Sequence, residues 1–215
     1  MKGCVRLTLL PAAMVATVAL AAAAPLTVTE LMQMLGSVES ANARFVETRH
    51  SALLKSPLVL QGTLSYRRPD RIEKHVLSPH DERITVEAGR LTLENRSQNR
   101  RKTIAVSSAP GLAALIESIR ATRAGDLAAL QRHYVVQLEG TREQWTLTLR
   151  PLESQVADYV ISIALAGSGS RIGRITTEEA GGDRSVMEVE EQGERAPSGK
   201  NLRGLPVPPA PPAAQ

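Results

Sequence analysis

The architecture of this chain is set by residues 58–93, LVLQGTLSYRRPDRIEKHVLSPHDERITVEAGRLTL. Apolar side chains recur there at every second position, as at Leu64 and Tyr66, while the other face is mainly polar. After a turn made by a proline and an aspartate, Ile72 and Val76 continue the alternation. A period of two is typical of half-buried β-strands, so this stretch predicts an antiparallel meander.

Upstream of the meander the period is helical. Apolar residues recur at three- and four-residue steps at Leu31, Met34, Leu35, Val38, Ala41 and Phe45. Thr27 and Glu30 have the spacing of a capping box. We therefore expect one amphipathic helix at the start of the domain, with alternation taking over from Ala43 onward.

Downstream of the meander, helical spacing returns after Pro110, and Asp126 is placed to cap a second helix of this region. Alternation resumes at Tyr134 and continues to Val189, so that the pattern holds eleven candidate strands and three helices. A sheet of that size curls because strands twist. The expected fold is mainly β with α: an incomplete, half-open antiparallel β-barrel of about 11 strands, with helices forming a lid.

The two ends of the chain differ in composition from this body. Lys2 and Arg6 precede an apolar run over residues 9–20, and four alanines follow. This is the pattern of a secretory signal; a membrane anchor is the alternative, but a spanning helix needs about 20 strongly apolar residues. Pro, Gly and Ala dominate the C-terminal end. We expect a cleaved signal peptide at 1–24, a folded domain at 25–192 and a proline-rich flexible tail at 193–215.

The composition is that of a folded protein outside the membrane. Of the 215 residues, 42% are hydrophobic and 22% are charged, which disfavours both wholesale disorder and a polytopic membrane protein. Aromatic residues make up only 2%, so aliphatic side chains must do most of the packing. Cys4 is the only cysteine and lies in the signal. An exported protein that lacks disulfides is typical of the bacterial periplasm, and we expect this location.

Net charge and motifs exclude several functions. The formal charge of +4 includes Lys2 and Arg6 of the signal. The nearly balanced remainder gives no support for nucleic-acid binding. No nucleophile elbow or phosphate loop is present, so we expect no enzyme and no cofactor. His75 and His80, beside two acidic residues, lack standard zinc spacing and are interpreted as a polar turn, so no metal site is expected.

A basic cluster occupies the end of the meander, at Arg96, Arg100, Arg101 and Lys102. A solvated hairpin turn is our interpretation. Contact with anionic lipid head groups or a membrane partner is the alternative.

Three segments resemble the periplasmic lipoprotein carriers of the LolA type. Residues 42–48, NARFVET, are similar to the family's first strand, with its phenylalanine followed by a polar pair. Residues 61–71, QGTLSYRRPDR, resemble its strand and basic-residue-proline turn, and residues 144–151, QWTLTLRP, another strand that ends in proline. The order of elements agrees over about residues 26–192.

The resemblance implies a carrier that shuttles acyl chains in a hydrophobic cavity toward the outer membrane. Its cargo would be an acylated lipoprotein or another lipid. It would work as a monomer between an inner-membrane donor and an outer-membrane acceptor. The family's turn arginine helps to hold the lid closed, and its match here is Arg68; a solvated turn arginine is the alternative. Ser65 and Glu73 stand where the family often has aromatic residues, so the chain looks like a divergent member.

We expect two sets of residues to carry this function. The predicted cavity lining is Leu60, Leu64, Val86, Leu91, Leu93, Trp145 and Leu147. The predicted lid residues are Leu112, Leu115 and Ile116. For each residue, ordinary core packing is the alternative. The competing function is a periplasmic lipid-sensing or protein-interaction module on the same scaffold.

Overall fold

The computed structural model describes residues 25–108 and 110–192, with only the backbone of residues 110–112, 114 and 115. The predicted signal and tail lie outside this part. Its elements are α1 (Val28–Gly36), β1 (Ser40–His50), β2 (Leu58–Arg67), β3 (Arg71–Ser78), β4 (Glu82–Glu87), β5 (Arg90–Asn95), β6 (Arg100–Ala105), the 3₁₀ helix η1 (Val106–Ser108), α2 (Pro110–Ala124), α3 (Leu127–His133), β7 (Tyr134–Gly140), β8 (Trp145–Pro151), α4 (Ser154–Ala157), β9 (Val160–Ser168), β10 (Arg171–Glu179) and β11 (Arg184–Glu191).

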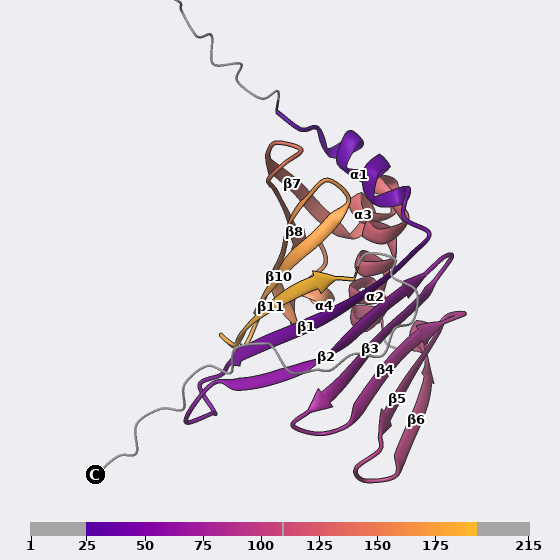
Figure 1. The fold of residues 1–215 in the computed structure, drawn as a ribbon, viewed down its shortest axis with the longest axis vertical. Helices are drawn as coiled ribbons and strands as arrows, with labels where there is room; N and C mark the ends of the chain where they lie inside the picture. Colours follow the sequence, from indigo (N-terminus) through magenta and orange to yellow (C-terminus); the bar gives the residue numbers. More distant parts are fainter. Residues whose placement is uncertain (1–24, 109, 193–215) are drawn as a thin grey trace, which may run out of the picture.

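All eleven strands form one antiparallel sheet. Its order is β6-β5-β4-β3-β2-β1-β11-β10-β9-β8-β7, so the first strand lies in the middle and pairs with both β2 and the last strand. The sheet is not closed, because β6 and β7 are its two edges. It curves, and the helices lie on one side of it with α2 in the hollow (Figure 1). The predicted class, an incomplete antiparallel barrel with helices, is confirmed.

Alternation in the sequence sets the register of the sheet. In β8, Trp145, Leu147 and Leu149 are almost fully buried while the residues between them are only partly buried. Cross-strand pairing brings Leu147 opposite Leu165 and Leu149 opposite Ile163 of β9. One face of the sheet is therefore apolar across neighbouring strands, as a period of two requires.

The N-terminal helix has the predicted capping box. Thr27 accepts from the Glu30 amide, and the Glu30 carboxylate accepts from the Thr27 amide. The helix is shorter than expected, however, and ends at Gly36, so Ala41 and Phe45 lie on β1. A Cβ at position 36 would lie 3.0 Å from a backbone oxygen of α2, so a glycine lets the two helices approach at this point.

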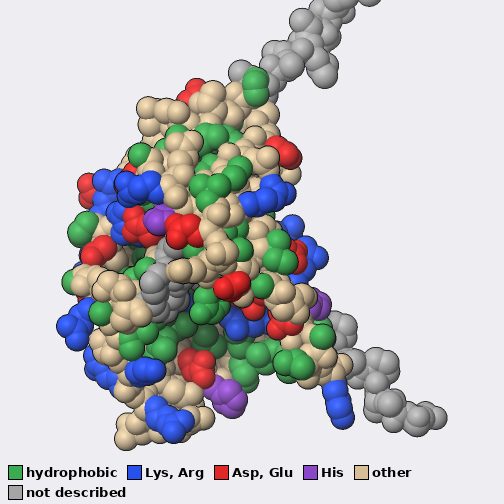
Figure 2. Space-filling view, turned by 180° about the vertical axis from the view of Figure 1, so that it is seen from behind, with side chains coloured by type: hydrophobic (Ala, Val, Ile, Leu, Met, Phe, Trp, Pro, Cys, Tyr) green, Lys and Arg blue, Asp and Glu red, His purple; other side chains and the backbone are tan. Residues whose placement is uncertain are grey.

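The main core lies where the helices cover β7–β9. Its central side chains are fully buried: Leu31, Leu35, Leu130, Tyr134, Trp145 and Leu147. The short helix α4 was not predicted; it contributes the buried Val156. Seen from behind, apolar side chains gather around a recess in the lower half of the molecule (Figure 2). No helix of the described part is long and apolar enough to cross a membrane.

Candidate functional site

A cavity of about 490 Å³ lies between α2 and the middle of the sheet. Eight elements contribute side chains to it: α2 and strands β1, β2, β3, β8, β9, β10 and β11. Aliphatic groups dominate the sheet side: Leu64, Ile72, Leu149, Val160, Ile163, Leu165, Ile172, Ile175, Met187 and Val189. The volume falls within the range of small-ligand pockets, and the apolar lining suits a hydrocarbon ligand.

The aliphatic floor follows directly from strand register. Ile175 of β10 lies opposite Leu165 of β9 on one side and opposite Met187 of β11 on the other. Because directly paired residues point to the same face, these side chains form a continuous apolar row beneath α2. None of the three is aromatic, so the row leaves space that larger rings would fill.

The helix α2 forms the roof of the cavity. The side of α2 that faces the cavity is mainly polar. Ser118, Ile119, Thr122 and Arg123 of α2 line the cavity, and at spacings of one, three and four residues they share one side of the helix. The Thr122 hydroxyl donates to the Ser118 carbonyl at 2.7 Å, which satisfies it within the helix. The backbone of α2 lies closest to the other helices and η1. Among the described side chains of α2, Ile119 is the only large apolar group that lines the cavity.

Two large side chains of the cavity lining are exposed to solvent. Ile119 of α2 is 46% exposed, and Tyr159, just before β9, is 64% exposed. Both line the cavity, so its apolar surface continues to solvent on this side. The solvent-exposed part of the lining thus includes apolar surface that an apolar ligand can contact.

A buried charge cluster closes one part of the cavity. Glu47 of β1 is only 2% exposed. Its carboxylate accepts hydrogen bonds from Lys74, from Arg49 Nε at 2.8 Å and from Ser185 Oγ at 2.7 Å. Burial alone would raise the pKa of Glu47, but the charge of Lys74 and the hydrogen bonds of its partners outweigh this and hold the pKa below its ordinary value. Burial lowers the pKa of Lys74, and Glu47 only partly opposes this.

A second polar pair lies at the boundary between α2 and β2. The Arg123 guanidinium carbon lies 6.0 Å from the centre of the Tyr66 ring. Arg123 Nη2 donates to Glu191 of β11 at 3.0 Å. This pair was not predicted. The available signal was that Arg123 shares a helix face with the small residues Ser118 and Thr122, a place where a core helix normally has leucine.

A family model described as outer membrane lipoprotein carrier protein, LolA-like, matches residues 20–190. The chain belongs to this LolA-like family. Members of the family are periplasmic and generally bind or carry lipid cargo and protein partners, without enzymatic activity. No curated protein matches the chain.

Three solved structures that are similar to this chain are distant from it in sequence. A LolA superfamily protein, NE2245 from Nitrosomonas europaea, is 12% identical with a TM-score of 0.44, over 80% of this chain and 96% of that one. A putative lipoprotein-sorting domain from Vibrio parahaemolyticus is 7% identical with a TM-score of 0.44, over 79% and 92%. A chain of the MucA/MucB complex of Pseudomonas aeruginosa is 12% identical with a TM-score of 0.44. The match covers 80% of this chain and 58% of that chain.

The LolA-like chain places only one predicted lining residue in the cavity, Leu64. Leu60 packs instead against a small cluster around Phe45. Trp145 and Leu147 belong to the core that the helices cover, and the Trp145 indole donates to the Gly169 carbonyl at 2.9 Å.

Three further predicted lining residues lie on the same face of the sheet, nearer its β6 edge. Pairing places Val86 opposite Leu91 and Ile84 opposite Leu93. Leu91 is buried, Val86 is half-buried and Leu93 is 38% exposed. None of the three is part of the cavity lining between α2 and the middle strands.

The predicted lid residues all belong to α2, but the cavity contacts lie farther along the helix. Ile116 is half-buried and does not line the cavity, whereas Ile119 does. The side chains of Leu112 and Leu115 lie outside the described part.

Arg68 bonds to α1 rather than to α2. Its guanidinium donates to the carbonyl of Gly36 at the end of α1, and its backbone amide donates to the Glu39 carbonyl at 2.9 Å. Close to Gly36 lies Gly125, just after α2, where a Cβ would lie 2.2 Å from the Met32 carbonyl. The β2–β3 turn is thus tied through α1 to the end of α2.

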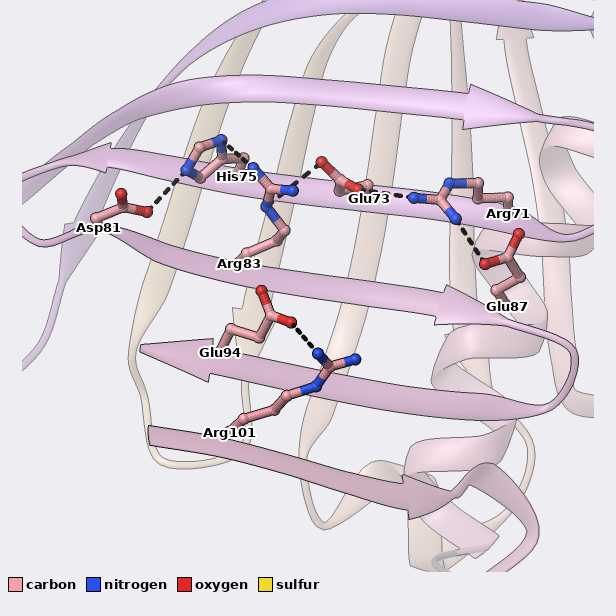
Figure 3. A network of polar contacts seen from close by, with 8 residues as sticks. All are labelled: Arg71, Glu73, His75, Asp81, Arg83, Glu87, Glu94 and Arg101. Atoms are coloured by element: carbon pink, nitrogen blue, oxygen red, sulfur yellow. Dashed lines mark hydrogen bonds and ion pairs between the residues drawn. The ribbon is translucent and has the colours of Figure 1, made fainter. Parts of the chain in front are cut away.

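The opposite face of β3–β6 carries a network of charges in a shallow groove of about 580 Å³ (Figure 3). Arg71 bridges Glu73 at 3.2 Å and Glu87 at 2.6 Å, and His75 Nε2 lies 2.8 Å from Asp81. The Arg71–Glu87 pair is open to solvent and contributes little to stability by itself, whereas Glu73 and His75 are largely buried. His75 thus pairs with Asp81, and among the described residues no group of His, Cys, Asp and Glu could hold a metal ion.

Proposed function

We propose that this LolA-like protein is a periplasmic carrier that binds an acyl chain of a lipoprotein or related lipid and shuttles it toward the outer membrane. The observation that supports this is the cavity of about 490 Å³ with its aliphatic floor, whose lining includes the exposed side chains of Ile119 and Tyr159. The predicted signal peptide and the family's location favour the periplasm. An inner-membrane donor and an outer-membrane acceptor complete the proposal, with the carrier acting as a monomer and not as an enzyme.

The energetics of lipid transfer explain why such a cavity is needed. Burying each methylene group is worth ~0.8 kcal/mol, so a palmitoyl chain is held in a bilayer by roughly 12 kcal/mol. Unassisted diffusion through water would be negligible. A cavity of about 490 Å³ lies in the size range of pockets that bind small molecules, so an acyl chain is a ligand of suitable size.

A carrier must also release its load, and the roof of the cavity is suited to this. The face of α2 above the cavity carries Ser118 and Thr122 where large apolar side chains would attach it firmly to the sheet. Arg68 ties the β2–β3 turn to α1, and α1 packs on the end of α2. We assign Arg68 the role of stabilising the closed, empty arrangement. Binding of the lipid then shifts the equilibrium from this closed arrangement toward an open, lipid-bound one.

The test is uptake of a fluorescent acyl probe by the delipidated protein, compared with two variants. Ala41→Phe adds a ring to the cavity lining, whereas Ala105→Phe adds the same ring at an exposed position on β6. We expect saturable uptake with one site by the wild type and Ala105→Phe, and at least tenfold weaker uptake by Ala41→Phe. Uptake that is absent from the wild type, or equal in all three proteins, contradicts the proposal.

A transfer assay separates this proposal from the lipid-sensing or interaction module. A carrier passes bound acyl cargo to acceptor vesicles faster than the lipid moves without protein. A sensing module binds the probe without accelerating its transfer.

A further inference from the structure

The hairpin of β1 and β2 projects beyond the neighbouring strand β3. Ser78, the last residue of β3, pairs with Gln61 of β2, so residues 58–60 extend past the end of β3. At about 3.4 Å per residue, this overhang is roughly 10 Å long. Residues 51–57 connect the two strands at its tip, which lies at the lower left of Figure 1. The tip therefore has no neighbouring strand on its β3 side.

The most exposed large apolar side chain of the described part lies at this tip. Leu53 is 94% exposed, and Leu54, Leu58 and Val59 are exposed as well. Leu58 and Val59 are successive residues of a strand and point to opposite faces of it. The projecting hairpin is therefore apolar on both faces. A cluster of exposed apolar side chains on one projecting segment is typical of a site that contacts a protein or a membrane.

The two leucines of the tip stand on a defined turn. The Leu54 amide donates to the Ser51 carbonyl at 3.1 Å, and the Leu53 amide donates to the Ser51 hydroxyl at 3.3 Å. These bonds hold the backbone of the loop, whereas neither leucine side chain belongs to a core cluster of the described part. The leucines are thus presented to solvent on a formed turn, and a partner does not have to order the loop first.

The charges of this hairpin are positive. Residues 49–59 include Arg49 and Lys55 but no acidic residue. Arg49 pairs with Glu47, whereas Lys55 takes part in none of the ion pairs among the described residues. A cation beside exposed leucines, with no acidic residue nearby in the loop, complements an anionic surface.

A second basic turn lies at the same end of the sheet. The β1–β2 loop and the β5–β6 turn both lie toward the lower end in Figure 1. The β5–β6 turn carries Arg96 and Arg100, which are exposed and also form no ion pair with a described residue. The β3–β4 turn between them carries Asp81 and Glu82, and both accept hydrogen bonds from side chains of the sheet. The end of the sheet that carries the leucines therefore also carries three cations without a carboxylate partner.

An anionic lipid bilayer is the partner that this surface fits. Each Lys or Arg near an anionic bilayer contributes about 1 kcal/mol, and apolar side chains gain further free energy when they enter the boundary between head groups and acyl chains. A narrow hairpin with apolar side chains on both faces is enclosed on both faces when it enters lipid. The surface of a folded partner would cover only one of them.

The cavity lining reaches the base of this hairpin, because Arg49 lines the cavity and lies two residues before the loop. We infer that the β1–β2 hairpin docks the protein on an anionic lipid bilayer by inserting Leu53 and Leu54 among the lipid head groups, while the three cations contact the lipid phosphates. The inference goes beyond the proposed function, since docking does not require cargo in the cavity. It places the cavity lining beside the bilayer.

The test of the apolar tip is co-sedimentation of the delipidated protein with protein-free vesicles. One set of vesicles is phosphatidylcholine alone, and the other also contains phosphatidylglycerol. Leu53→Ser/Leu54→Ser removes the apolar tip. The matched control is Leu152→Ser/Ile161→Ser, which removes two exposed apolar side chains outside the hairpin.

The test of the charges uses one cation at each end of the sheet. Lys55→Ser removes the cation of the loop. The control is Arg142→Ser, since Arg142 is exposed in the β7–β8 turn, at the end of the sheet where β1 begins. Both variants are measured at low and at high salt.

We expect the wild type to bind the anionic vesicles about tenfold more tightly than phosphatidylcholine vesicles, and to lose most of this preference at high salt. Leu53→Ser/Leu54→Ser should weaken binding about tenfold and Lys55→Ser about fivefold, while both controls stay within about twofold of the wild type. A wild type that binds neither kind of vesicle overturns the inference, as does equal weakening by a hairpin variant and its control.

Two further outcomes separate the alternatives. Binding to native membrane vesicles but not to protein-free ones overturns the inference in favour of a membrane protein as the partner. Leu53 and Leu54 do not line the cavity, so their variant should take up the acyl probe as the wild type does. Loss of probe uptake in the wild type, with vesicle binding retained, contradicts the carrier proposal and supports the docking inference alone.

Discussion

The Lys74 ammonium of β3 donates a hydrogen bond to the buried Glu47 carboxylate of β1, across the intervening strand β2. The two side chains belong to the cavity wall, at positions where the alternation of both strands predicts apolar residues. Because Glu47 is 2% exposed, its charge depends on these partners and not on water. The cavity is therefore bounded by a fixed charge cluster beside its aliphatic floor.

Replacing Glu47 should destabilise the fold. Glu47→Gln leaves Lys74 partly buried without its counter-charge, and removing one partner of such a pair costs about 3 kcal/mol. Urea unfolding measures the loss. Glu190→Gln is the matched control, because Glu190 lies on the same sheet but is exposed, and it should change stability by less than about 0.5 kcal/mol. Equal effects of the two substitutions would contradict a structural role for the pair.

Acid should remove the stabilisation that Glu47 supplies. The pKa of its carboxyl in the folded protein is below the ordinary value of 4.5, so the unfolded state takes up the proton first as pH falls. The contribution is complete above about pH 4.5 and is lost as the pH falls through the folded pKa. Unfolding curves between pH 3 and 6 should be steeper in pH for the wild type than for Glu47→Gln; identical slopes would rule this out.

Loss of the hydrogen bond between Arg68 and Gly36 should favour the lipid-bound state. Arg68→Leu removes the hydrogen bond to Gly36, worth about 1 kcal/mol at this exposed site, from the closed arrangement. Acyl probe affinity should then rise about fivefold, and transfer to acceptor vesicles should slow by a similar factor. The control is Arg67→Leu, the exposed neighbour on β2. Transfer rates that stay unchanged in Arg68→Leu would remove Arg68 from the release step.

Two leucines of the predicted lining should behave differently. Leu147 is fully buried in the helix-covered core, so Leu147→Ala should cost about 2 to 5 kcal/mol of stability and leave probe affinity within twofold. Leu64 lines the cavity and is half-buried, so Leu64→Ala should cost less stability and weaken probe binding about fivefold. Calorimetry and probe titration on the same samples check both; the reverse pattern would contradict the assigned cavity.

Sequence patterns predicted the strands and the sheet class well, because alternation reports directly which face is buried. They did not predict where helices cover that face. Leu64 and Leu147 have the same alternation, and only the packing of α1 to α4 makes one a cavity residue and the other a core residue. The helix α4 was missed because four residues carry no helical period.

The polar residues of the site could not be assigned from composition alone. Glu47 is in phase with Phe45, and Lys74 with Ile72, so each interrupts an apolar face in a way that was visible in the sequence. The alternation does not show that β1 and β3 both pair with β2. This arrangement brings the two charges together. Tyr66 and Arg123 are likewise 57 positions apart and meet only because α2 lies over β2.

Native mass spectrometry of the protein purified without detergent, followed by lipid extraction, tests the carrier proposal most directly. We expect one acylated molecule per chain in the wild type and in Ala105→Phe, and a nearly lipid-free mass for Ala41→Phe. A lipid-free mass for the wild type, together with no uptake of an added acyl probe, would contradict the proposal and favour the interaction module.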